Sequence, residues 1–324
     1  MTLPVRSVLL ASLGALPLTV GAASLPDTLT IPGEKIFPES LTSSTDGSVI
    51  IGSISQKQIY RVKPGSDTAE VWIPAGTDGL NNTFGVFADN RANTLYACSN
   101  LLGPPGAAPA VNATLYAFDL KSGASKARYV FPTDKGFCND IAVDSQGNVY
   151  ATDSSNMEIV RLKKGGTALE VWAGNGDFGK PQDHGVLDGL SVLGNRVYAN
   201  TLMTSKLFTV PIGADGKAGA VAEVKLDHEI SRPDGMRSFG KSDVLIVESG
   251  NGGRLERIAL NGATGKVTTL KEGYPDGPVS VTVVGTTAYV LEGQLATLMR
   301  KPGTPADTAP PKPFKATAVQ VGHP

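Results

Sequence analysis

The sequence predicts an all-β fold, a six-bladed β-propeller with four-stranded antiparallel blades around a central channel, because one short phrase recurs six times. Each copy has a hinge, an apolar strand, a turn and a second strand that ends in small polar residues, and copies recur about every 45 to 55 residues. The copies begin at Phe37, Thr83, Phe137, Val186, Arg232 and Gly277. The chain also contains 38 Gly and 22 Pro and lacks long apolar segments of helical period, which favours short strands joined by tight turns.

The strands that complete each blade follow the two strands of the repeated phrase. A third strand with one buried face is predicted at QIYRVK from Gln58 and RLERIAL from Arg254, and a fourth at LEVWAG from Leu169. The last copy shows only three clear strands before a proline-rich stretch that starts at Lys301. Either residues 314–321 or the N-terminal DTLTIPG segment must cover its outer edge, and we favour the C-terminal segment.

Length and charge limit the classes of function. The 324 residues include 29 basic and 30 acidic side chains, so nothing indicates nucleic acid or a polybasic membrane contact as a partner. A propeller is a closed ring that cannot be divided into halves with separate cores. We therefore expect one domain over residues 24–324, a monomer that binds a small-molecule substrate.

The first 23 residues are typical of a secretory signal peptide. Arg6 precedes an apolar stretch from Val8 to about Val20, and small residues follow through Ala23. Cleavage after Ala23 would place the mature protein in the periplasm or outside the cell, with no membrane contact, although an uncleaved anchor is an alternative. Such compartments are oxidising, so Cys98 and Cys138, which the repeat places on one rim of adjacent blades, are either a disulfide or two buried thiols.

One position of the repeated phrase carries oxygen in four of its six copies. Along the chain this position holds Glu39, Phe84, Asn139, Asp188, Asp234 and Val279. Equivalent positions of a propeller converge on the channel, and carboxylate and amide oxygens are the ligands of Ca²⁺. Another divalent cation could bind the same oxygens, although an amide oxygen suits zinc poorly. The alternative is that Asp and Asn are ordinary turn formers, as they often are before Gly.

Four motifs, in this order, resemble those of a known family. They are FPES from Phe37, CNDIAVDSQGNVYATDS from Cys138, LDGLSV from Leu187 and RPDGM from Arg232. Together they resemble the senescence-marker protein/gluconolactonase/regucalcin family, which is related more distantly to diisopropylfluorophosphatase, paraoxonase and strictosidine synthase. The resemblance implies a six-bladed propeller, one divalent cation at the channel mouth, usually calcium, and hydrolysis of lactones or phosphoesters.

The resemblance also suggests roles for individual residues. It implies Glu39, Asn139 and Asp234 as metal ligands and Asp234 as the base that activates water, whereas Asp188 stands where the family usually has Asn. We expect Asp188 as the fourth ligand and the second candidate for the base, because an extra carboxylate in one site has a perturbed pKa. Phe137 stands where sugar lactonases of the family carry Arg, and with Phe84 it favours an apolar lactone or ester.

Further substrate contacts are predicted around the channel mouth. The second strands end in polar residues that either contact the substrate or are solvated strand ends; these are Asn100, Asp153, Asn200, Glu248 and Glu292. His184, four residues before Asp188, is a further candidate for substrate contact. An insertion over residues 101–112 is either a lid or a tolerated surface loop. Two other functions compete with hydrolysis: a non-catalytic calcium-stabilised propeller that binds a ligand or protein, and a metal-free condensation like that of strictosidine synthase.

Overall fold

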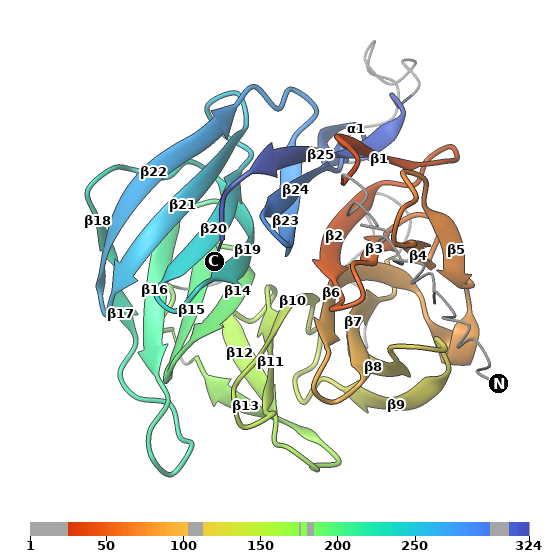
Figure 1. Cartoon of the computed structure of the whole chain (residues 1–324). Coiled ribbons are helices and arrows are strands. Elements are labelled where there is room, and N and C mark those ends of the chain that lie inside the picture. The colour runs from red at the N-terminus through yellow and green to blue at the C-terminus, as the bar shows by residue number, and fades with distance from the viewer. Residues whose placement is uncertain (1–24, 103–112, 175, 180–184, 299–310, 324) are drawn as a thin grey trace, which may run out of the picture.

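Six β-sheets surround a central axis in the structure, a computed structural model that describes residues 25–102, 113–174, 176–179, 185–298 and 311–323 (Figure 1). The first strand of each sheet contacts the first strands of the two neighbouring sheets, so the sheets form a closed ring. The predicted six-bladed β-propeller is confirmed. Helical structure within the described ranges is limited to η1 (Thr77–Gly79) and α1 (Leu295–Leu298).

Blades 1 to 3 each contain four antiparallel strands in sequence order from the channel outward. Blade 1 comprises β2 (Pro38–Ser43), β3 (Val49–Ser53), β4 (Ile59–Val62) and β5 (Glu70–Ile73). Blade 2 comprises β6 (Asn82–Asp89), β7 (Thr94–Asn100), β8 (Thr114–Asp119) and β9 (Ser125–Val130). Blade 3 comprises β10 (Cys138–Val143), β11 (Val149–Asp153), β12 (Glu158–Leu162) and β13 (Leu169–Ala173).

Blades 4 to 6 follow the same plan, except that blade 5 has a fifth strand and blade 6 takes its outer strand from the N-terminus. Blade 4 comprises β14 (Leu187–Leu193), β15 (Arg196–Thr201), β16 (Lys206–Pro211) and β17 (Ala222–Glu223). Blade 5 comprises β19 (Pro233–Phe239), β20 (Asp243–Glu248), β21 (Arg254–Asn261), β22 (Thr264–Glu272) and an outer β18 (Lys225–Leu226), which is parallel to β22. Blade 6 comprises β23 (Pro278–Val284), β24 (Thr287–Glu292), β25 (Phe314–Gln320) and β1 (Thr28–Ile31).

The order of strands in blade 6 differs from the predicted closure of the ring. The C-terminal strand β25 pairs with β24 as the third strand, and the N-terminal strand β1 covers it as the outer fourth strand. The expectation that residues 314–321 form the outer strand is therefore wrong. The segment from Leu295, which directly follows the second strand, begins the short helix α1 instead of a third strand. The N-terminal and C-terminal strands of the propeller thus pair with each other in one blade. This pairing satisfies the backbone groups of β25 that would otherwise form an exposed sheet edge.

Apolar side chains fill the spaces between neighbouring blades. Six buried clusters alternate with the six blades around the ring, and the cluster between blades 6 and 1 joins Leu29 and Phe314 to Leu41. The cluster between blades 2 and 3 contains a disulfide that joins Cys98 to Cys138, with Cα atoms 5.1 Å apart. Of the two readings of the cysteines, the disulfide is confirmed.

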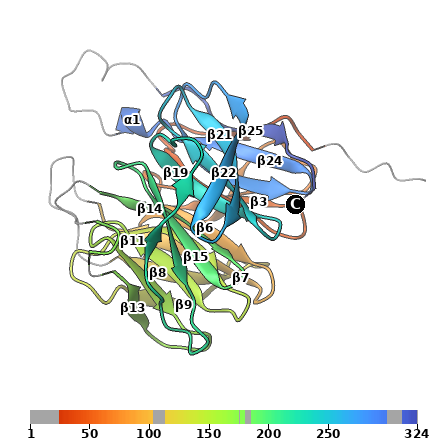
Figure 2. The same cartoon turned by 90° about the vertical axis from the view of Figure 1, so that its left-hand side faces the viewer.

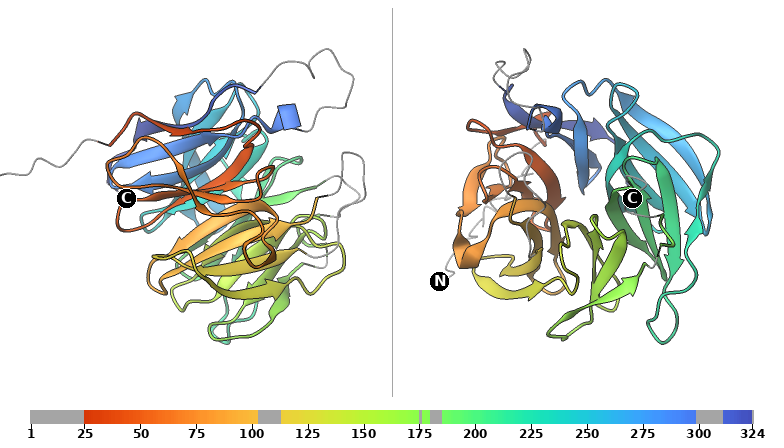
Figure 3. Two further views of the ribbon diagram at one scale, coloured as in Figure 1. Left: turned by 90° about the vertical axis from the view of Figure 1, so that its right-hand side faces the viewer. Right: turned by 180° about the vertical axis from the view of Figure 1, so that it is seen from behind.

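The edge-on views place helix α1 beyond one face of the ring (Figures 2 and 3). Residues of α1 and of blades 5 and 6 line one cavity there, so we call this face the channel mouth. The helices that the structure describes include none long and apolar enough to cross a bilayer.

Candidate metal centre at the channel mouth

All six first strands are irregular at the same place. In every blade the register between the first and second strands shifts at the oxygen-bearing position of the repeat, as it does between Pro38 and Leu41 of β2. A bulge leaves an extra residue unpaired and re-aims its side chain. The bulge in β2 contains Glu39, and the equivalent bulges in β14 and β19 contain Asp188 and Asp234. The repeat therefore fixes both the position and the direction of these side chains.

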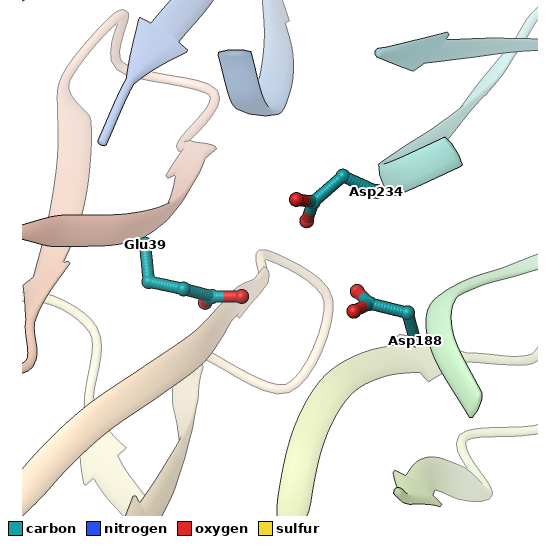
Figure 4. Close-up of side chains that lie close together, drawn as sticks. All are labelled: Glu39, Asp188 and Asp234. Atoms are coloured by element: carbon teal, nitrogen blue, oxygen red, sulfur yellow. The ribbon is translucent and has the colours of Figure 1, made fainter. Parts of the chain in front are cut away.

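Three carboxylates converge on one point from three blades. Glu39, Asp188 and Asp234 each place one carboxylate oxygen within 4.8 Å of the others (Figure 4). Each of the three residues is 4 to 6% exposed. Groups that lie 39, 188 and 234 residues along the chain thus form one buried anionic centre.

The side chain of Asn139 lies beside Asp188 in the same centre. Its Nδ2 donates to Ser154 Oγ at 3.1 Å, and Ser154 Oγ in turn donates to the carbonyl of Leu187 at 2.6 Å. The amide is therefore oriented with Oδ1 free, and this buried oxygen has no hydrogen-bond partner among the described residues. Glu39 Oε2 is buried and unpartnered in the same way. Buried oxygens without donors are costly, so two of them beside a carboxylate cluster fit a bound cation.

Burial and neighbouring negative charges raise the pKa values of all three carboxyl groups. Burial is the largest cause for each of them. The pKa of Asp188 rises to about 7, with the charge of Asp140 as the next cause, and the pKa values of Glu39 and Asp234 rise with the charge of Asp188 as their next cause. Carboxylates this close cannot all ionise without a counter-charge.

The alternative that Asp188 and Asp234 are turn formers is wrong. Both lie inside first strands, β14 and β19, each followed by a glycine. A Cβ atom at Gly189 would lie 2.3 Å from the carbonyl oxygen of Asp234 in the next blade. Glycine is needed at this position because the neighbouring blade approaches too closely for any side chain.

A buried ion pair below this centre was not predicted from the sequence. Arg237 Nη1 lies 2.9 Å from both carboxylate oxygens of Asp140, and each of these two residues is less than 8% exposed. Arg237 Nη2 also donates to Ser40 Oγ at 3.1 Å and to the carbonyl of Val86 at 3.1 Å. The guanidinium thus connects blades 1, 2, 3 and 5 in the channel.

The sequence did carry a signal for this pair. The position after each oxygen-bearing residue holds a small residue in five copies and a carboxylate in one; these residues are Ser40, Gly85, Asp140, Gly189, Gly235 and Ser280. A single charged side chain in a row of Ser and Gly indicates a specific partner inside the channel.

The polar residues at the ends of the second strands are buried, and their side chains form hydrogen bonds to backbone groups. Each is at most 3% exposed. Asn100 and Asn200 reach into the next blade, where they bind the backbone of Cys138 and the carbonyl of Asp234. The carboxylates of Asp153, Glu248 and Glu292 accept backbone N–H groups of the segment that leads into their own blade; the donors are Phe137, Ser231 and Asp276. The predicted contact of these five side chains with substrate finds no support in these bonds.

The cavity at the mouth has a volume of about 560 Å³ and includes Asp234 in its lining. Glu39, Asn139 and Asp188 do not line it, whereas Arg232 and Tyr274 do. Phe84 and Phe137 contact each other edge to face, with ring centroids 4.7 Å apart. This aromatic pair belongs to the apolar cluster between blades 2 and 3 and does not line the cavity, whereas Arg232 of blade 5 does. His184 and residues 103–112 of the predicted insertion lie outside the described residues.

The fold and this centre together define a six-bladed propeller with a cluster of buried carboxylates at one mouth. No protein-family model matches the sequence, and no curated protein matches it. Solved structures match across most of their length. A gluconolactonase from Xanthomonas campestris has a TM-score of 0.61 at 12% identity, covering 90% of this chain and 89% of that one.

Two further solved structures show the same fold. A luciferin-regenerating enzyme has a TM-score of 0.63 at 12% identity, covering 91% of this chain and 96% of that one. The major Malassezia sympodialis allergen Mala s 1 has a TM-score of 0.67 at 13% identity, covering 92% of this chain and 97% of that one. The fold agrees with the resemblance that the four sequence motifs indicate.

Proposed function

We propose that this protein is a calcium-dependent hydrolase of a lactone or related ester. The observation that carries the proposal is the convergence of Glu39, Asp188 and Asp234, together with Asn139 beside Asp188, whose Oδ1 has no partner among the described residues. Four oxygen ligands, one of them a neutral amide, suit a hard cation such as Ca²⁺. The gluconolactonase-like structural neighbours support hydrolysis as the chemistry.

The proposed roles follow from where each residue lies. When bound, the cation would polarise the carbonyl of the ester and stabilise the developing oxyanion. Asp234 is the better candidate for the base, because it alone of the four candidate ligand residues lines the cavity in which a substrate could sit. Burial and then the charge of Asp188 raise the pKa of Asp234, which makes its carboxylate a better proton acceptor than an ordinary aspartate. Asp188 is the second candidate.

Calcium should stabilise the folded protein. A ligand that binds only the native state adds about 2.7 kcal/mol at a hundredfold excess over its dissociation constant. We therefore expect calcium to raise the melting temperature and a chelator to lower it, as measured by calorimetry together with elemental analysis. An unchanged melting curve in chelator, with no metal in the purified protein, would eliminate the site.

This stabilisation should grow with pH. The folded-state pKa of Asp188 is raised from 3.8 to about 7, mainly by burial, so the metal-free native state holds protons that the unfolded chain releases. The metal-free protein should therefore lose stability as pH rises from about 4 through about 7. Calcium replaces those protons, so its affinity should rise over the same range. Melting curves in chelator and in calcium at pH 5 and pH 8 measure both trends.

The aromatic pair should favour an apolar substrate. Burial of an alkyl or aryl ring against Phe84 and Phe137 contributes about 25 cal/mol per Å² of apolar surface, which a polyhydroxylated ring cannot gain. We expect a higher kcat/KM for an alkyl or aryl lactone than for gluconolactone, and Phe137→Arg should narrow the difference. A wild-type protein that prefers gluconolactone tenfold or more would refute this reading of the pocket.

A non-catalytic calcium-stabilised propeller is the competing proposal, and a panel of lactones and aryl esters assayed with and without chelator separates the two.

We also propose that the protein works in the periplasm or outside the cell. The disulfide between Cys98 and Cys138 supports this location, because such bonds persist in oxidising compartments.

A further inference from the structure

We propose that Arg232 forms an anion-binding subsite at the channel mouth and that the substrate is a lactone or ester that carries a carboxylate group. This inference rests on the proposed function. It concerns blade 5, which lies across the ring from the aromatic pair of blades 2 and 3.

The backbone holds Arg232 in an uncommon conformation. Its φ is 50°, in the left-handed region that residues other than Gly rarely adopt. Three hydrogen bonds fix it there: Ser205 Oγ accepts from its N–H at 2.9 Å, and its carbonyl accepts from Ser249 N at 3.0 Å and Ser249 Oγ at 3.2 Å. Such strain persists only where surrounding contacts determine it, and it concentrates at functional sites. Arg232 therefore has a fixed place two residues before Asp234.

The guanidinium of Arg232 is available for a ligand. The side chain is exposed, and its described polar contact is Nη1 to Met203 Sδ at 3.4 Å. No carboxylate of the described residues forms an ion pair with it, in contrast to Lys312 of the same cavity, whose Nζ lies 2.6 Å from Asp276 Oδ1. Two residues before the oxygen-bearing position, Arg232 is also the one charged residue among the six copies; the others hold Phe37, Asn82, Phe137, Val186 and Gly277.

Tyr274 also lines this cavity. Tyr274 is 3% exposed, yet its hydroxyl has no hydrogen-bond partner within the described part of the chain. Tyr274, Arg232 and Asp234 line the one cavity of about 560 Å³. A buried hydroxyl without a partner is costly, so a residue of this kind in the cavity that Arg232 also lines points to an oxygen-bearing ligand.

A carboxylate is the group that these donors suit. A guanidinium binds a carboxylate through two parallel N–H···O bonds, and a phenol can donate to either oxygen. The ester carbonyl would lie near the carboxylate cluster, with Asp234 between the two parts of the substrate. The simpler alternative is that Arg232 only offsets the charge of the three carboxylates, and it predicts no preference among substrates.

The test compares a phthalide with a carboxylate on its aromatic ring to the same phthalide with a carboxamide. We expect wild-type protein to prefer the carboxylate about tenfold in kcat/KM, and Arg232→Met to remove this preference while leaving the carboxamide unchanged. Arg232→Lys should retain part of it. The matched control is Arg196→Met, at the start of β15 on the opposite face from the mouth, which should change neither substrate. Equal losses on both phthalides, or no loss on either, would overturn the inference.

A binding experiment separates this inference from the proposed function. The phthalan carboxylate, which has a methylene in place of the lactone carbonyl, cannot be hydrolysed. Titration calorimetry on calcium-loaded protein should show that wild type binds it about tenfold more tightly than Arg232→Met does. Such binding without hydrolysis of any phthalide would refute the hydrolase and keep the subsite. Hydrolysis of both phthalides with equal efficiency, with no binding of the phthalan carboxylate, would refute the subsite and keep the hydrolase.

Discussion

Asp234→Asn is expected to lower turnover about a hundredfold or more even when calcium saturates the site. The asparagine side chain keeps an oxygen for the cation and for the N–H of Gly235, which lies 3.0 Å from Asp234 Oδ1. It cannot accept a proton from water, so the loss should appear in kcat. Single-turnover kinetics at saturating calcium, with the calcium dissociation constant measured by titration, gives both quantities.

Glu39→Gln is the matched comparison for this prediction. Glu39 belongs to the same cluster but does not line the cavity, and its Oε2 has no donor among the residues that the structure describes. Loss of its charge should weaken calcium binding, and excess calcium should restore most of the turnover. Small and equal effects of both substitutions on activity would reject the separation of base from ligand.

The repeat predicted the architecture because each blade repeats the same local chemistry. Alternating strands and Gly-containing turns specify hairpins, and hairpins with one apolar face must stack into a ring. The equivalence of positions across copies then brought Glu39, Asp188 and Asp234 to one place, as Figure 4 shows. The convergence of these side chains could be predicted from the period of the repeat alone, because equivalent positions of a propeller face the same channel.

The misplaced features depend on contacts between distant segments. Whether β1 or β25 forms the outer strand of blade 6 is decided by which termini meet in space, and both segments alternate in the same way. The ends of the second strands, such as Asn100 and Glu248, were read as pocket walls because their partners are backbone atoms, which have no sequence signature. For Arg237 the sequence carries one signal, the carboxylate of Asp140 in a row of Ser and Gly, but the backbone carbonyls that Arg237 also binds in blades 1 and 2 have none.

Arg237→Met should lower the free energy of unfolding by about 3 to 5 kcal/mol, because it removes one member of a buried ion pair and leaves Asp140 without its partner. Arg237 also donates to the carbonyls of Leu41 and Met236, so several acceptors in the channel would lose their donor. Urea denaturation at fixed calcium concentration measures the change, with the m-value as a check that the folded state remains compact.

The double substitution Arg237→Met with Asp140→Asn shows whether the isolated charge is the cause. An amide at position 140 carries no uncompensated charge, so the double variant should be more stable than Arg237→Met by about 1 to 3 kcal/mol. Arg196→Met, which removes an arginine from the opposite face, should change stability by less than about 0.5 kcal/mol. If Arg237→Met is no more harmful than Arg196→Met, the ion pair does not hold the four blades together. If the double variant is instead less stable than Arg237→Met, Asp140 stabilises the channel through its bonds to the N–H groups of Ile141 and Leu190, not through its charge.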